Sequence, residues 1–139
     1  MQWSTEELHN WEELQPYVDT ALLPVYLYGG NVSLPEHVKR MSYLSRLAIA
    51  VEQRLRGRVL LFPLSYQIGR EKACTALPPE FPYVFLLRFA GHELELAADS
   101  AGQKARTFQI GTDELESELR FDITVDVLHQ EIVNSWQGK

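Results

Sequence analysis

The sequence predicts an α/β fold, a three-layer α/β/α sandwich in which helices cover both faces of a mostly parallel or mixed sheet. A nearly continuous apolar run at 19–28 is typical of a strand that is buried on both faces. A helical pattern that begins at Ser33 follows it, and a second short apolar run comes at 59–62. Strand, helix and strand with short loops form a βαβ unit, whose two strands are parallel and joined by a right-handed crossover.

The first strand is preceded by a short helix and contains a proline. Ser4 and Glu7 have the spacing of a capping box, so we expect a helix that runs to about Leu14, and Pro16 discourages its continuation. Within the strand, Pro24 cannot donate a hydrogen bond to a neighbouring strand. The strand is therefore expected to lie near an edge, to be bulged, or to end there.

The main helix is the clearest element of the sequence. Ser33 and Glu36 form a second capping box, with a proline in the first turn, and Gly57 is the natural end. Apolar residues follow at spacings of three and four, which places them on one face. That face is expected to consist of Val38, Met41, Leu44, Leu47, Ala48, Val51 and Leu55.

The second half of the chain is expected to complete the sheet. Residues 68–82, rich in proline, predict a loop with room for one helical turn, and the apolar run 83–89 predicts a third strand that joins in parallel. The alternative is an α+β fold with an antiparallel meander from 83 to 110. The remaining elements are expected as a half-exposed strand at 92–98, a turn at 100–102, a last strand at 106–110 and a closing helix at 122–136.

Several stretches resemble a known group of proteins. They are the Met-x-Trp start, the segment Tyr17–Pro24, the helix that follows, and the segment Gly57–Pro63. In these stretches, about the first half of the chain, the sequence is similar to the YpiF-like family of small bacterial proteins. The resemblance implies a cytoplasmic bacterial domain. It implies no activity, so no catalytic residue is carried over from it.

Size and composition predict one domain, 1–139, in the cytoplasm. The apolar fraction of 45% and the charged fraction of 23% are ordinary for a globular protein. The N-terminus lacks the pattern of a secretory signal, and the apolar runs are strand-sized, so membrane insertion is not expected. The single cysteine, Cys74, cannot form an internal disulfide, which fits a reducing compartment.

Charge is unevenly distributed along the chain, with a net value of −6. Nucleic-acid binding is disfavoured, because the phosphate backbone demands clustered positive charge. Arg54, Arg56 and Arg58 contrast with the acidic segment 113–118, so they are expected either to pair with it, within one molecule or in a dimer, or to form a solvated helix end. The acidic residues considered are Asp113, Glu114, Glu116 and Glu118.

Candidate ligand-binding residues come from topology. In open α/β sheets, ligands bind beyond the carboxyl ends of the strands. Tyr28 and Asn31 follow the first strand, while Ser65 and Tyr66 follow the second, so the four are expected to line one rim. The alternative is that both tyrosines cover the end of the sheet.

No pattern specifies catalysis. The four histidines lack paired metal-ligand spacing, and no nucleophile motif is present, so no metal, cofactor or catalytic residue is predicted. We therefore expect a non-enzymatic accessory or protein-interaction domain, with a protein partner or a homodimer. The alternative is a small-molecule or nucleotide-binding domain that uses the rim near Asn31 and Tyr66.

Overall fold

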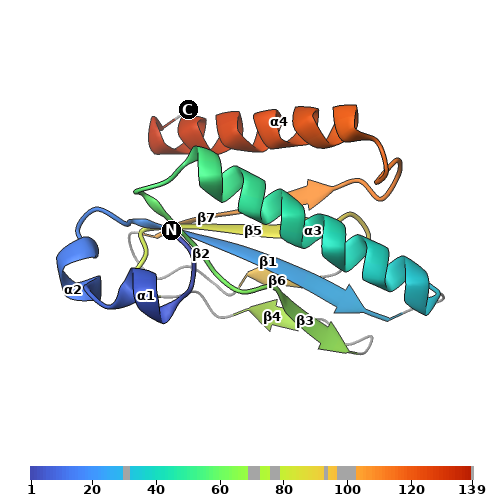
Figure 1. Cartoon of the computed structure of the whole chain (residues 1–139), viewed down its shortest axis with the longest axis horizontal. Helices are drawn as coiled ribbons and strands as arrows, with labels where there is room; N and C mark the ends of the chain where they lie inside the picture. Colours follow the sequence, from blue (N-terminus) through green and yellow to red (C-terminus); the bar gives the residue numbers. More distant parts are fainter. Residues whose placement is uncertain (30–31, 69–72, 76–78, 93, 97–102, 139) are drawn as a thin grey trace.

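A computed structural model describes residues 1–29, 32–68, 73–75, 79–92, 94–96 and 103–138. The main sheet has the order β2-β1-β5-β7, with β3 beside β1, and every pair of strands is parallel (Figure 1). The strands of this sheet are β1 (Thr20–Tyr28), β2 (Val59–Leu61), β3 (Ser65–Ile68), β5 (Tyr83–Phe89) and β7 (Lys104–Ile110). The predicted α/β class with a parallel sheet is confirmed. The antiparallel alternative is not observed, since β5 and β7 are parallel.

Long helices cover one face of the sheet and short ones pack against the other. Helices α3 (Leu34–Arg54) and α4 (Glu118–Trp136) lie together on one face (Figure 1). The opposite face packs against α1 (Thr5–Leu8) and α2 (Trp11–Leu14), which contribute three partly buried apolar side chains. The predicted single N-terminal helix is therefore two helices of four residues each.

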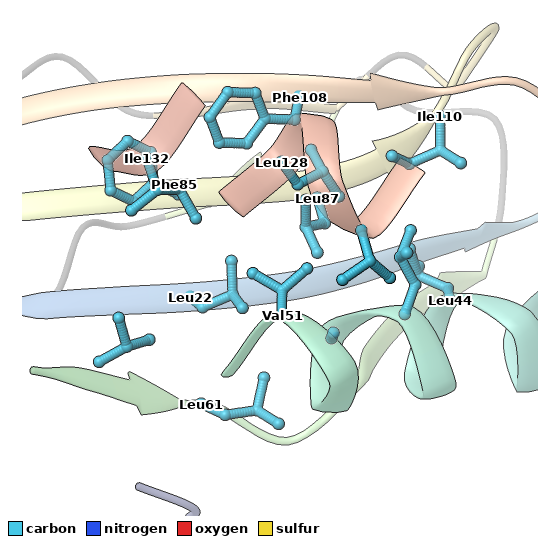
Figure 2. Close-up of a cluster of buried hydrophobic side chains, with 14 of the residues drawn as sticks. Leu22, Leu44, Val51, Leu61, Phe85, Leu87, Phe108, Ile110, Leu128 and Ile132 are labelled. Atoms are coloured by element: carbon cyan, nitrogen blue, oxygen red, sulfur yellow. The ribbon is translucent and has the colours of Figure 1, made fainter. Parts of the chain in front are cut away.

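The main core lies between the sheet and the two long helices. Figure 2 shows Leu22 and Phe85 from the sheet meeting Val51 of α3 and Ile132 of α4. The first of these strand residues and both helix residues are inaccessible to solvent. This layer carries most of the buried apolar surface of the described chain, and apolar burial is the main driving force for folding.

Helix α3 confirms most of its predicted face and corrects one position. Ser33 Oγ accepts the amide of Glu36 at 3.4 Å, as predicted for the cap. The helix ends at Arg54 with Leu55 as its C-cap, earlier than predicted, and Gly57, at φ +92°, lies in the turn that follows. Val38, however, is mostly exposed, whereas its neighbour His37 is buried. The core face of this first turn is therefore shifted by one position, because the imidazole finds a hydrogen-bond partner inside.

Pro24 lies inside the sheet, on a strand that has neighbours on both sides. Proline is tolerated there because the side that lacks an N–H faces the point of the adjacent edge, between β2 and β3, where the pairing is interrupted. The Leu22 carbonyl accepts a hydrogen bond at 3.0 Å from that edge, so alternate residues of β1, Pro24 included, direct their peptide groups toward it. Leu22 faces Leu61 but Val25 faces Ser65, which means that the edge gains one residue between β2 and β3. The predicted irregularity is thus a bulge, and it lies on the neighbouring edge between β2 and β3. At this bulge, the sheet requires no backbone hydrogen bond from Pro24.

The connection after β3 differs from the prediction. The predicted loop at 68–82 contains a strand, β4 (Ala73–Thr75), which pairs in parallel with β6 (Leu94–Leu96) in a separate two-stranded sheet. The local pattern could not reveal β4, because its partner lies far along the chain. The turn predicted at 100–102 falls outside the described residues.

Candidate functional site

A buried polar cluster lies where β1 ends and α3 begins. The hydroxyl of Tyr26 forms a hydrogen bond with Nδ1 of His37 at 2.6 Å, and the ring centroid of Tyr28 lies 4.2 Å from that of the same imidazole. From the loop after β5, Nδ1 of His92 accepts the amide of Leu27 at 3.3 Å. The pairing of β1 with β5 ends before Leu27, so His92 satisfies an amide that the sheet leaves open.

The environment of this cluster sets its protonation. Burial, reinforced by the positive charges of Arg40 and Arg88 and by His37, lowers the pKa of His92 from 6.5 to about 4. Burial also raises the pKa of the Tyr26 hydroxyl above its ordinary value of 10.0. At neutral pH, His92 is therefore an uncharged acceptor and Tyr26 an intact donor.

The Tyr26–His37 pair at the centre of this cluster is closed to solvent. Tyr26 is inaccessible and His37 is 3% exposed, while both are engaged with each other. Within the described residues, no group of three His, Cys, Asp or Glu side chains could hold a metal ion. The arrangement stabilises the end of the sheet and positions the start of α3.

The four predicted rim residues are placed differently by the structure. Tyr28 is half-buried against His37, and Tyr66 is 60% exposed on β3. Register places Tyr66 beside Tyr26 and Ser65 beside Val25, so Tyr66 shares the α3 side of the sheet and Ser65 the other side. Asn31 lies outside the described residues. Ligand binding by this rim stays a prediction.

An apolar surface lies at the edge formed by β3 and the adjoining flank of α3. We call it the β3–α3 surface, and each of its large side chains is more than half exposed. Its members are Trp3, Leu34, Val38, Tyr66 and Ile68.

A groove of about 190 Å³ continues this surface toward β2. Ser45 and Ile49 of α3 form one wall, and Phe62 and Leu64 of the bulged edge form the other. Trp3 contacts Phe62 edge-to-face, with 4.6 Å between ring centroids, and lines the same groove. Leu34 and Val38 precede Ser45 by about three and two helical turns, respectively, so they extend the same flank of α3 toward β3.

The predicted pairing of the basic run with the acidic segment is wrong, because the members of both groups that form ion pairs do so with other residues of the same molecule. Glu116 pairs with Lys39 at 2.8 Å and Glu118 with Arg46 at 3.5 Å, so two basic residues of α3 hold the acidic segment. Arg54 instead pairs with Asp126 of α4. These pairs are exposed, so each contributes little to stability.

Arg58 was expected either to pair with the acidic segment or to be solvated, but its side chain is partly buried and pairs with Asp19. Its guanidinium forms a two-pronged pair with Asp19, at 2.9 and 3.0 Å, and stacks 3.9 Å above the ring of Trp136. Trp136 Nε1 donates to the hydroxyl of the buried Thr20 at 2.9 Å. This network ties the starts of β1 and β2 to the end of α4.

A comparison with known proteins finds similarity to YpiF of Bacillus subtilis (strain 168), at 26% identity over 142 residues, which cover 96% of this chain and 94% of the relative. The predicted resemblance to the YpiF-like family is confirmed. It includes the second half of the chain, where the sequence alone showed little. No family model and no solved structure match the chain. YpiF is itself an uncharacterized protein, so the comparison indicates no activity.

Two groups of residues were missed from the sequence. His37 and His92 are distant in the chain, and only the topology brings both to Tyr26. The exposed flank at Leu34 and Val38 was also missed, since Val38 was expected on the buried face of α3 and Leu34 was not part of the predicted face. No helix in the described part of the chain is long and apolar enough to cross a membrane.

Proposed function

We propose that this protein is a non-enzymatic interaction domain whose β3–α3 surface binds an extended apolar segment of a partner protein. The observation that carries the proposal is the clustering of large exposed apolar side chains beside an unpaired strand edge. Clustered apolar exposure of this kind is typical of interaction sites. A cytoplasmic location belongs to the same proposal, because the lone cysteine fits a reducing compartment.

The edge of β3 has the chemistry for strand addition. Tyr26 of β1 faces Tyr66, so in a parallel ladder it bonds to the residues on either side, Ser65 and Gln67. The peptide groups of Tyr66 and Ile68 then face outward, toward no other strand of the described chain. An added segment would satisfy these groups, and its side chains would pack beside Tyr66 and Ile68.

The chain already uses this mode of binding on the same edge. Gln2 forms a parallel bridge with Leu61, and the amide of Leu61 donates to the Met1 carbonyl at 2.8 Å. The N-terminal segment thus covers the outer edge of β2 and then turns away at Trp3. An extended partner segment would pair with β3 in the same way that the N-terminal segment pairs with β2. The described members of the β3–α3 surface are all aromatic or aliphatic, which favours an apolar segment.

A displayed library of extended peptides, selected on the immobilised protein, tests the proposal. We expect enrichment of segments that alternate apolar residues. The double variant Tyr66→Lys/Ile68→Lys is expected to bind the selected peptides at least about tenfold more weakly, because it places two charges on the apolar face. N-methylation of alternate amides in a selected peptide is expected to abolish binding, since strand addition requires them.

The control is Val127→Lys, an equivalent change on α4 that is expected to leave peptide binding unchanged. Circular dichroism and thermal melting verify that each variant is folded. The proposal is wrong if no peptide is enriched, or if the enriched peptides bind the double variant as tightly as the wild type.

A further inference from the structure

The opposite edge of the sheet is formed by β7, which has seven residues and one described neighbour, β5. The Lys104 amide donates to the carbonyl of Pro82 at 2.7 Å, and the Ile110 carbonyl accepts the amide of Ala90 at 2.8 Å. Even-numbered residues of β7 therefore bond inward to β5. The odd-numbered residues, Ala105, Thr107 and Gln109, direct their N–H and C=O groups outward.

This spacing is self-complementary. An antiparallel pair of β7 strands with its two-fold axis at Thr107 would set Ala105 of one copy opposite Gln109 of the other. Thr107 would face its own counterpart. Each facing pair would have both peptide groups directed at the other copy, which is the hydrogen-bonded arrangement of an antiparallel ladder.

Helix α4 offers an apolar flank above the same edge. Ile123 and Val127 are about half exposed and lie one helical turn apart. Together with Ile110 and Gly111 they line a groove of about 260 Å³ between α4 and the end of β7. In the two-fold arrangement, the α4 helices of both copies would lie on the same face of the joined sheet, with these flanks turned toward each other.

Charge complementarity supports a second copy as the occupant. Lys104 stands at the beginning of β7, and the acidic Asp113 follows its end, while Arg106 already pairs with Glu131 of its own chain. Asp113 has no ion-pair partner among the described residues. Antiparallel pairing brings the basic beginning of one strand toward the acidic end of the other, twice per dimer.

We propose that two copies of this chain associate through β7 and α4, with the two-fold axis at Thr107, to form one continuous sheet. This inference does not depend on the β3–α3 surface, which lies at the other edge.

Light scattering after size exclusion, over a concentration series, tests the proposal, and the expected mass is twice 16.0 kDa. Thr107→Pro removes an outward N–H that the monomer does not use, and proline is tolerated on an edge. We expect this variant to melt cooperatively as a monomer, with a dimer dissociation constant raised at least about a hundredfold.

If the proline variant does not fold, the proposal is tested by reversing the charges at Lys104 and Asp113. Lys104→Glu and Asp113→Lys are each expected to raise the dissociation constant about tenfold, and the double exchange to restore it. A wild type that stays monomeric at all concentrations overturns the proposal. So does a dimer that survives Thr107→Pro or shows no rescue by the double exchange.

Discussion

At the carboxyl end of the sheet, single side chains form hydrogen bonds with polar groups that have no partner in the strand pairing. The ladder between β1 and β5 stops short of Leu27, and the imidazole of His92 accepts the amide that remains. The hydroxyl of Tyr26 similarly satisfies His37 inside the core. Buried polar groups of this kind cost free energy when they lose their partner.

Acid is expected to destabilise the protein through His92. Its pKa is about 4 in the folded state and near 6.5 in the unfolded state, so the unfolded chain binds the proton first. The stability it contributes is complete above about pH 6.5 and is lost as the pH falls toward 4. Urea unfolding of the wild type and of His92→Gln, from about pH 7 to about pH 4.5, measures this loss.

The difference between the two pH profiles isolates His92, because every other titrating group is common to both proteins. We expect the wild type to lose more stability than the variant on acidification. Equal losses of stability in the two proteins would show that His92 is not responsible for the destabilisation in acid.

Removing the Tyr26 hydroxyl tests the buried pair. Tyr26→Phe leaves Nδ1 of His37 without its hydrogen-bond partner in the core, so we expect the free energy of unfolding to fall by about 1–3 kcal/mol. Tyr43→Phe is the control, because Tyr43 is also buried but forms no described hydrogen bond. Equal losses in chemical denaturation of the two variants would contradict the role of the pair.

At the scale of elements, local signals predicted what local physics controls. The caps at Ser4 and Ser33, the period of α3 and the turn at Gly57 all depend on residues within one or two helical turns. The strand β4 was missed, because a three-residue strand exists only through its distant partner β6. The polar cluster and the β3–α3 surface escaped prediction for the same reason: register and topology assemble them.

Helix α4 depends on its N-terminal cap. Ser117 Oγ accepts the amide of Arg120 at 3.2 Å, and Ser117→Ala is expected to cost about 1 kcal/mol in thermal or urea unfolding. Ser42→Ala, an exposed interior position of α3, is the control and is expected to be neutral or slightly stabilising. A Ser117 variant as stable as the control would mean that the cap contributes nothing.

At the scale of the whole molecule, one network at the amino ends of the strands joins the beginning of the sheet to the end of the chain. Thr20 donates to Asp19 at 2.9 Å and accepts from Trp136, while Arg58 contacts both of these partners. Nothing in the local sequence pairs these residues. These contacts form only when β1, β2 and α4 are packed together.

Thr20→Val tests this docking. The change keeps the shape of the side chain but removes the hydroxyl, so the indole N–H of Trp136 is left without its acceptor. We expect a loss of about 1–3 kcal/mol in chemical denaturation. Trp136→Phe removes the donor, and in its background the Thr20 change is expected to cost less. Additive losses would argue against coupling between the two residues.

The uniformly parallel sheet has a consequence for synthesis. Thr20 pairs with Val59 on one side and with Tyr83 on the other, so no strand finds a partner close by in sequence. Contacts of this range slow folding, because long loops must close before any pairing is gained. As the chain leaves the ribosome, the apolar β1 emerges long before β5 exists. We therefore expect the nascent protein to need shielding until most of its length has been made.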